Sequence, residues 1–176
     1  MYPGDDVSPW LKKKQHMTRK KPWNRVNLPV YSISSKNGQQ HNMHIITYAS
    51  QISLQPKQFV CGVYHGTKTL ENIEASGSFV LQLLAAGQYR LVDLLGKKSG
   101  HSIDKISRLQ KRKELEEWNG FYILKNCLSV MQLSVTGSFQ GGDHKGFICD
   151  VSAWKNLHDG EALTLDVLRA HKLIRI

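Results

Sequence analysis

The segment Tyr64-His65-Gly66-Thr67-Lys68-Thr69 carries side chains that suit the binding of an anion. It stands between a short apolar run, 59–64, typical of a buried strand, and a run with the end signals of a helix. Backbone N–H groups at a helix start lack partners and carry partial positive charge, so the hydroxyls, the lysine and the flexible glycine could cradle a phosphate. A capped helix with an exposed lysine explains the same residues, and both interpretations stay open.

A second group of small polar residues lies just upstream, in Thr47-Tyr48-Ala49-Ser50-Gln51-Ile52-Ser53. This β-rich run ends before Pro56, and such a strand could present backbone groups to a flat ring with polar edges. An ordinary strand has the same pattern.

No familiar catalytic motif is present: G-x-S-x-G, H-E-x-x-H, a Walker loop and G-x-G-x-x-G after a strand are all missing. His41 and His44 are three residues apart in a β-rich run, which directs the two rings to opposite sides of a strand. The sequence therefore predicts no metal site.

Short strands punctuated by turn residues, with three helices among them, would position these groups. The pattern predicts strands at 28–35, 41–53, 59–64, 78–84, 121–124, 128–139, 146–154 and 163–168, and helices at 69–75, 88–95 and 105–117. This order predicts an α+β fold that is mainly β, a barrel with a few short inserted helices, over residues 27–176. Residues 1–26 predict a basic N-terminal extension, with Trp10 and Trp23 as its candidate anchors.

The charge of +10 is concentrated in two segments. Residues 1–26 hold seven basic residues against two acidic ones, and residues 97–113 hold seven against one. A tail and one local patch on a nearly neutral body argue against a general nucleic-acid binder. The three cysteines are far apart and lie in apolar runs, which predicts buried, unpaired thiols. The sequence shows no signal peptide and no apolar run long enough to span a bilayer. We therefore expect a cytoplasmic protein without membrane contact.

Four motifs follow one another in the chain. They are Ser50-x-x-Ser53-Leu54-x-Pro56, then Thr69-Leu70-x-Asn72-Ile73-x-x-Ser76-Gly77-x-Phe79-Val80-Leu81-x-Leu83, then Leu95-Gly96-Lys97-Lys98-Ser99-Gly100 followed by Asp104-Lys105, and Gly142-Asp143-His144 before a strand. In this order they resemble the flavin reductase family with the FMN-binding split barrel, in its flavoredoxin-like branch. The chain departs from the family pattern at three places. Thr47-Tyr48 stands where the family often has Asn or Ser followed by a hydroxyl residue, His101 stands where arginine is common, and Pro56-Lys57 stands where the family has two prolines.

The resemblance implies a homodimer that binds one FMN, or alternatively FAD, in each split barrel near the subunit interface. It implies that Thr47, Tyr48, Ala49 and Ser50 line the isoalloxazine and ribityl chain, and that Ser53, His65, Thr67, Lys68 and Thr69 lie near the phosphate. Ser99, Gly100 and Lys105 correspond to a loop that closes over the cofactor, and His144 to a position beside the flavin face where nicotinamide stacks.

The function that follows is hydride transfer from NADH or NADPH to flavin, for which the cofactor supplies the chemistry. Two alternatives remain at this stage. One is a flavoredoxin-like electron carrier that exchanges electrons with a redox protein partner and does not oxidise nicotinamide itself. The other is a cofactor-free basic barrel that binds nucleic acid or an acidic partner through salt-sensitive contacts.

Overall fold

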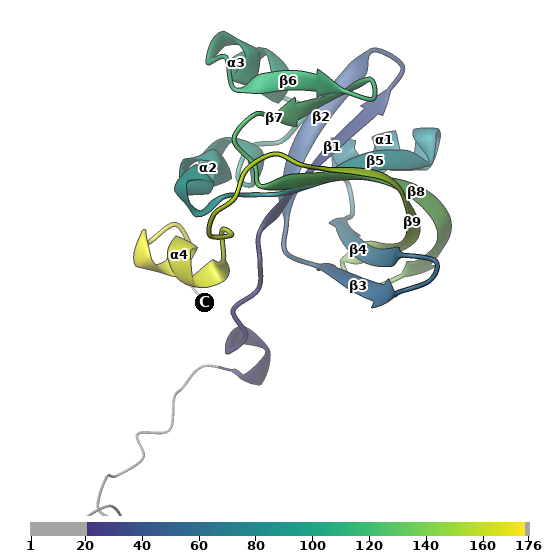
Figure 1. The fold of residues 1–176 in the computed structure, drawn as a ribbon, viewed down its shortest axis with the longest axis horizontal. Helices are drawn as coiled ribbons and strands as arrows, with labels where there is room; N and C mark the ends of the chain where they lie inside the picture. The colour runs from purple at the N-terminus through teal and green to yellow at the C-terminus, as the bar shows by residue number, and fades with distance from the viewer. Residues whose placement is uncertain (1–20, 175–176) are drawn as a thin grey trace, which may run out of the picture.

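One curved antiparallel sheet dominates the computed structural model, which describes residues 21–174 (Figure 1). Its seven strands lie in the order β2-β1-β5-β8-β9-β4-β3. Their bounds are Tyr31–Asn37 (β1), Gln40–Ile46 (β2), Ala49–Ser53 (β3), Gln58–Tyr64 (β4), Ser78–Leu83 (β5), Ser129–Gln140 (β8) and His144–Asn156 (β9). The predicted mainly β fold is confirmed.

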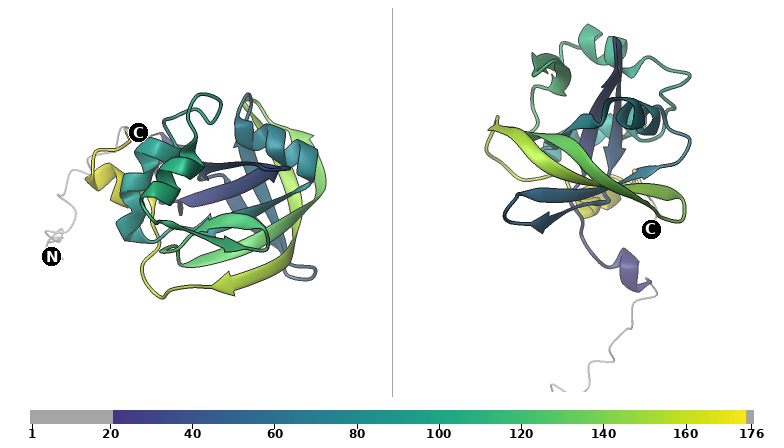
Figure 2. Two further views of the ribbon diagram at one scale, coloured as in Figure 1. Left: turned by 90° about the horizontal axis from the view of Figure 1, so that it is seen from above. Right: turned by 90° about the vertical axis from the view of Figure 1, so that its right-hand side faces the viewer.

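The long β8–β9 hairpin carries the sheet round a bend, from β5 on one side to β4 on the other (Figures 1 and 2). Register shifts interrupt the pairing of the two strands between Gln132 and Leu133 and between Val135 and Gly137. Such bulges increase the local twist and bend a strand, which allows the sheet to close toward a barrel.

Short helices and a second hairpin cover the sheet. The α-helices are Lys68–Ser76 (α1), Leu91–Leu95 (α2), Lys105–Lys111 (α3) and Leu165–Ala170 (α4); 3-10 turns span Pro22–Asn24 (η2) and Ala86–Arg90 (η3), and Leu115–Trp118 (β6) pairs with Phe121–Leu124 (β7). Helix α1 packs on β1, whereas α2 and α3 pack on β2. Hydrogen bonds from Asn42 to Thr69 and from Lys105 to the Met43 carbonyl place the starts of α1 and α3 against β2.

Three predicted elements are wrong. The single strand predicted over 41–53 is two strands, β2 and β3, which form the opposite edges of the seven-stranded sheet. The helix predicted over 105–117 ends at Lys111, and Leu115–Trp118 is a strand, because Lys113 has a left-handed φ of 59° that interrupts the helix. The strand predicted over 163–168 is helix α4. Leu163 pairs with the backbone of Leu84, after which Thr164 stands at the N-cap and the chain turns into the helix.

The core has two parts, one on each face of the sheet. On β5 the side chains of Phe79 and Leu81 pack into the part beneath α1, and Val80 between them packs into the part beneath α2 and α3. Both faces of this central strand are therefore buried, as its continuous apolar run predicts. The predicted burial of the three cysteines is confirmed, and burial raises the pKa of the Cys127 and Cys149 thiols to about 12.

Most of the predicted N-terminal extension, residues 1–20 with Trp10, lies outside the described residues. Trp23 is 70% exposed on η2 and so does not anchor this segment to the barrel. Within residues 21–174, none of the helices has the length and apolarity needed to cross a membrane.

Candidate functional site

A cavity of about 260 Å³ lies where the start of α1 faces the loop that follows α2. We call it the anion pocket. It brings together six of the residues predicted for the site, namely His65, Thr67, Lys68, Ser99, Gly100 and Lys105. Seven further residues complete its lining, namely Asn42, His44, Tyr64, Gly66, Gly96, Lys97 and Lys98. Four lysines and no carboxylate stand among these lining residues, so the pocket suits an anion.

The start of α1 is fixed by its own sequence. Thr67 Oγ1 donates a hydrogen bond to the Tyr64 carbonyl (2.9 Å) and accepts one from the Leu70 N–H (3.2 Å). Gly66 provides the turn before the cap with a φ of 68°. The Thr67 hydroxyl is thus used in the N-cap, and what the turn offers a ligand is the first backbone N–H groups of the helix and the Lys68 ammonium.

Lys105 lies at the first turn of α3 with only 2% of its surface exposed. Its Nζ donates to the carbonyls of Met43 (3.1 Å) and Leu95 (3.0 Å), and so joins β2 to the end of α2. Burial lowers the pKa of this ammonium from 10.5 to about 8. The predicted loop residue is therefore a buried cation at the wall of the anion pocket.

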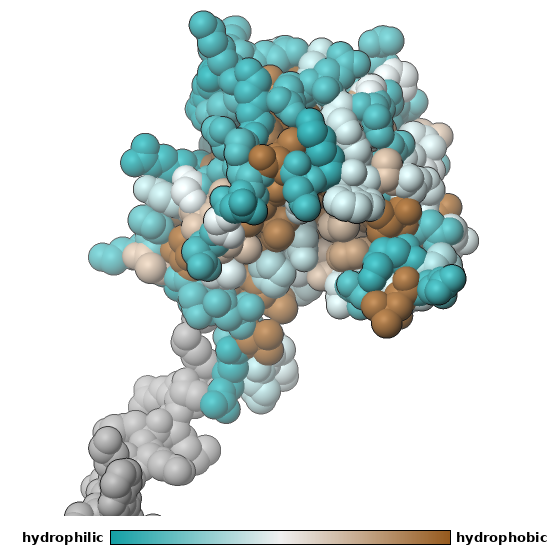
Figure 3. All heavy atoms as spheres, in the orientation of Figure 1, coloured by the Kyte–Doolittle hydropathy of each residue, from teal (hydrophilic) through white to brown (hydrophobic). Residues whose placement is uncertain are grey.

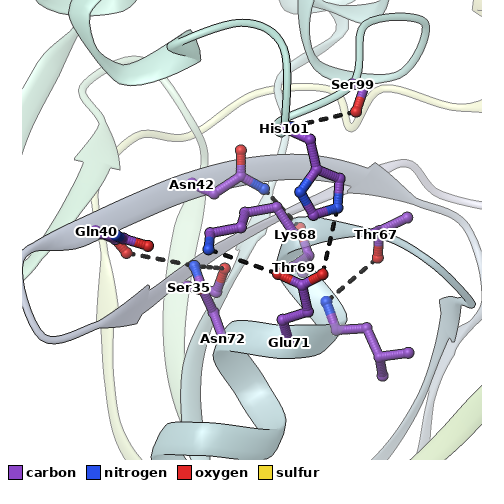
Figure 4. A network of polar contacts seen from close by, with 11 residues as sticks. Ser35, Gln40, Asn42, Thr67, Lys68, Thr69, Glu71, Asn72, Ser99 and His101 are labelled. Carbon is purple, nitrogen blue, oxygen red and sulfur yellow. Dashed lines mark hydrogen bonds and ion pairs between the residues drawn. The ribbon is translucent and has the colours of Figure 1, made fainter.

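Asn42 is the main residue of the pocket that the sequence reasoning missed. It is 4% exposed, and its Nδ2 donates to Thr69 Oγ1 (2.9 Å), as Figure 4 shows. A Cβ at Gly100 would lie 2.5 Å from Asn42 Oδ1, so only glycine lets the 96–104 loop approach this closely. The available signal was the alternation along 40–46, which puts Asn42 and His44 on one face of the strand.

A larger cavity of about 490 Å³, the ring pocket, adjoins the anion pocket. The two share four lining residues, namely His44, Tyr64, Gly96 and Lys97. The rest of the ring pocket is lined by Ile45, Ile46, Thr47, Tyr48, Gly62, Val92, His144, Leu165, Leu168 and Ile174. Burial, with Lys105 and His144 nearby, lowers the pKa of His44 to about 4, so its imidazole is neutral at pH 7. Mostly apolar walls and a neutral imidazole suit a flat, uncharged ring.

His144 stands at the edge of the ring pocket between two tyrosines. Its ring centroid is 4.9 Å from that of Tyr48 and 5.2 Å from that of Tyr64, both edge-on. Its Nδ1 is hydrogen-bonded to Asp143 Oδ1 (2.6 Å), and this bond lowers the pKa of the Asp143 carboxyl. Gly62 leaves the space that Tyr48 uses, because a Cβ there would lie 3.2 Å from the tyrosine Cβ. The imidazole is therefore held in one orientation.

The structure does not bring every predicted residue to these two pockets. Thr69 is fully buried and accepts the Asn42 hydrogen bond, and Ser53 lies at the far end of β3. Ala49 and Ser50 line another, more apolar cavity of about 320 Å³ with Phe139, and this cavity adjoins the ring pocket because the two share Tyr48, Gly62 and His144. Ile52 on β3 and Leu54 in the turn that follows are exposed, at 50% and 77%. Figure 3 shows separate apolar patches, divided by hydrophilic atoms, on the side of the molecule where β3 and β4 lie.

Comparison with known proteins assigns this architecture. A family model described as "Flavin reductase like domain" matches residues 23–171. The chain belongs to the flavin reductase-like family. The fold is accordingly the split barrel of that family, and the resemblance inferred from the sequence motifs is confirmed.

Relatives of this flavin reductase-like chain include larger proteins. A high molecular weight rubredoxin of Moorella thermoacetica is 27% identical over 136 residues, or 77% of this chain. A putative diflavin flavoprotein A 2 of a Nostoc species is 26% identical over 142 residues, or 79% of this chain. The chain spans 58% and 24% of the lengths of these two relatives, which therefore contain further segments.

Solved structures share the fold of this flavin reductase-like chain at low identity. BorF, the flavin reductase component of a bacterial two-component tryptophan halogenase, has a TM-score of 0.71 at 15% identity, covering 81% of this chain and 88% of its own. A flavoredoxin from Methanosarcina acetivorans has a TM-score of 0.67 at 20% identity, covering 77% and 74%. An FMN-binding protein from Thermus thermophilus has a TM-score of 0.69 at 18% identity, covering 89% and 79%.

Proposed function

We propose that this flavin reductase-like protein binds a flavin mononucleotide unit and transfers a hydride to it from NADH or NADPH. The observation that carries the proposal is the pair of adjoining cavities. One is lined by lysines and a helix start, and the other is larger and mostly apolar, with a neutral histidine between them. A cationic cavity next to a mostly apolar one suits a ligand in which a phosphate is joined to a flat ring system.

The residues present fit such a group. Lys105 is a buried ammonium whose two hydrogen-bond partners are both carbonyls, so an anion in the adjoining pocket would give it the opposite charge that it lacks. Lys68, 23% exposed at its side chain, would contact the same phosphate from the start of α1. Lys98 would add to the positive potential from the facing loop, and Lys97 would add less, because its Nζ is paired with Asp93 Oδ1 (2.7 Å).

When bound, flavin accepts a hydride from a reduced nicotinamide, which explains why the chain needs no catalytic nucleophile. The role of the protein would be to orient the flavin and nicotinamide rings and to exclude water from them. His144, held by Asp143 between Tyr48 and Tyr64, is the side chain proposed to contact the nicotinamide. Lys97, which lines both pockets, would also stabilise the negative charge that reduction adds to the ring.

The test is spectroscopic. The purified protein is titrated with FMN under anaerobic conditions, binding is followed by flavin fluorescence, and NADH or NADPH is then added while flavin absorbance is recorded. We expect saturable binding and bleaching by at least one nucleotide. Failure to bind FMN would refute FMN as the cofactor. Binding of FMN without bleaching by NADH or NADPH would refute a nicotinamide nucleotide as the hydride donor.

A second candidate function is electron carriage, with a redox protein as donor. It is favoured by the relatives, because one is named a rubredoxin, another a diflavin flavoprotein and a third a flavoredoxin. The experiment that separates the two functions compares reduction by nicotinamides with reduction by a reduced rubredoxin. An electron carrier would be reduced slowly by the former and rapidly by the latter.

We also propose that the protein is a homodimer joined through the apolar surface around Phe139, which is half exposed next to the ring pocket. Burying this surface against a second copy would enclose the adjacent site. Light scattering should give twice the mass of 20.0 kDa. Phe139→Ser should reduce it to the single-chain mass, whereas Trp23→Ser should not; a wild-type monomer would refute the dimer.

A further inference from the structure

Glu71, in the first turn of α1, lies close to basic side chains from both walls of the anion pocket (Figure 4). Its Oε2 is 3.5 Å from Nζ of Lys68, which lines the pocket from the start of the helix. Its Oε1 is 3.4 Å from Nε2 of His101, which follows Gly100 in the facing 96–104 loop. The described lining of the pocket holds no carboxylate, so Glu71 brings a negative charge to the Lys68 ammonium from outside that lining.

The contact between Glu71 and Lys68 is a loose one. A hydrogen bond between an ammonium and a carboxylate is about 2.7–2.9 Å long. Glu74, one turn further along α1, meets this length with Lys145 Nζ at 2.8 Å, whereas Glu71 stays 3.5 Å from Lys68. The Glu71 side chain is 53% exposed, and an exposed ion pair adds little to the free energy of unfolding. Lys68 can therefore exchange Glu71 for another anion at little cost to the fold.

A flavin phosphate in the anion pocket would compete with Glu71 for Lys68. Only 23% of the Lys68 side chain is exposed, so two anions that contact its ammonium must lie close together. A phosphate monoester carries a charge of about −1.5 to −2 at pH 7, and like charges at short range repel each other. The phosphate therefore binds against the repulsion of the Glu71 carboxylate or displaces that carboxylate into solvent, and both routes weaken binding.

We propose that Glu71 is a specificity-determining residue, which limits the affinity for the flavin phosphate by competing with it for Lys68. FMN then exchanges more readily, and its advantage over riboflavin, which has the same ring system without the phosphate, is smaller. This inference rests on the proposed function, because that function puts the flavin phosphate in the anion pocket.

The experiment measures the dissociation constants of FMN and riboflavin by fluorescence for the wild type and two variants. Glu71→Gln removes the charge and keeps the size of the side chain. Glu74→Gln is the matched control, because it makes the same change on the same helix at a carboxylate that is paired with Lys145. The titrations are made at about 0.15 M salt, where exposed charges more than roughly 8 Å apart are largely screened.

We expect Glu71→Gln to bind FMN about fivefold more tightly, which is the upper end of the effect of one exposed charge pair. Stopped flow should show that most of this gain is a slower dissociation of FMN. The affinity for riboflavin should stay the same, and the gain for FMN should shrink as the salt concentration is raised. Glu74→Gln should leave the affinities for both flavins unchanged.

The other outcomes contradict the inference. An unchanged or weaker affinity of Glu71→Gln for FMN refutes the competition, and a weaker one assigns Glu71 to the support of the pocket wall. An equal gain for riboflavin excludes the phosphate as the group affected, and an equal gain in Glu74→Gln assigns the effect to the net charge of the protein. These three results leave the flavin site in place, whereas failure of the wild type and both variants to bind FMN refutes the proposed function as well.

Discussion

Replacing Lys105 by methionine removes a buried charge without much change in length. In the protein this ammonium donates to the Met43 and Leu95 carbonyls and lies against the anion pocket. Burial lowers its pKa from 10.5 to about 8. An anion bound nearby favours the charged form, so the pKa of Lys105 must rise when a phosphate binds.

The size of the effect follows from these two values. If a bound phosphate restores the ordinary pKa of 10.5, the complex keeps the proton between pH 7 and 9 while the free protein loses it. Binding then requires proton uptake above pH 8, and linkage lowers the affinity for FMN by about tenfold over this interval. Lys105→Met should bind FMN more weakly at pH 7 and show little of this decline.

The assay is a fluorescence titration of FMN at several pH values between 7 and 9. Lys98→Met is the control, because Lys98 lines the same pocket from an exposed position; it should weaken binding and leave the decline with pH in place. Circular dichroism would verify that the Lys105 variant is folded. A decline of equal size in Lys105→Met and the wild type would refute the role given to this residue.

Three other substitutions have defined expectations. Gly100→Ala puts a Cβ 2.5 Å from Asn42 Oδ1 and should weaken flavin binding, whereas Gly87→Ala, with open space around its Cβ, should not; equal titration curves for both would contradict the close approach of the loop. Phe79→Ala empties a fully buried position and should lower the free energy of unfolding by about 3–5 kcal/mol in denaturant melts, and a loss below about 1 kcal/mol would contradict the core described. Asp143→Asn removes the carboxylate that orients the neighbouring imidazole and should slow flavin reduction in stopped flow by about tenfold with FMN affinity unchanged; an unaltered rate would argue against that imidazole as the nicotinamide contact.

Most strands could be predicted because short apolar runs end at turn residues. The Asn37-Gly38 turn between β1 and β2 and the glycine that ends α1 are examples in which local sequence decides local structure. The failures occur where a backbone angle or a neighbour decides. Lys113 adopts a positive φ that no local pattern requires, and β6 is a strand only because β7 folds back onto it.

The same distinction applies to the site. Residues 64–69 could be predicted as one group because the helix start and its cap are local. The sequence could not show that Asn42 reaches this group from β2, or that Thr69 turns away to meet it, because both depend on the packing of α1. The resemblance assigns Lys105 to a loop that closes over the cofactor. Its burial at the first turn of α3 could not be predicted, because that burial depends on the packing of α3 on β2.

The burial of the cysteines has a practical consequence for measurement. Cys61, Cys127 and Cys149 are all buried, and burial raises the pKa of each thiol, so the reactive thiolate is scarce at neutral pH. A cysteine introduced on the surface would therefore react with a maleimide dye much faster than the native three. Energy transfer between a dye on the 96–104 loop and a bound flavin could then be used to follow flavin binding, with the three native cysteines left in place.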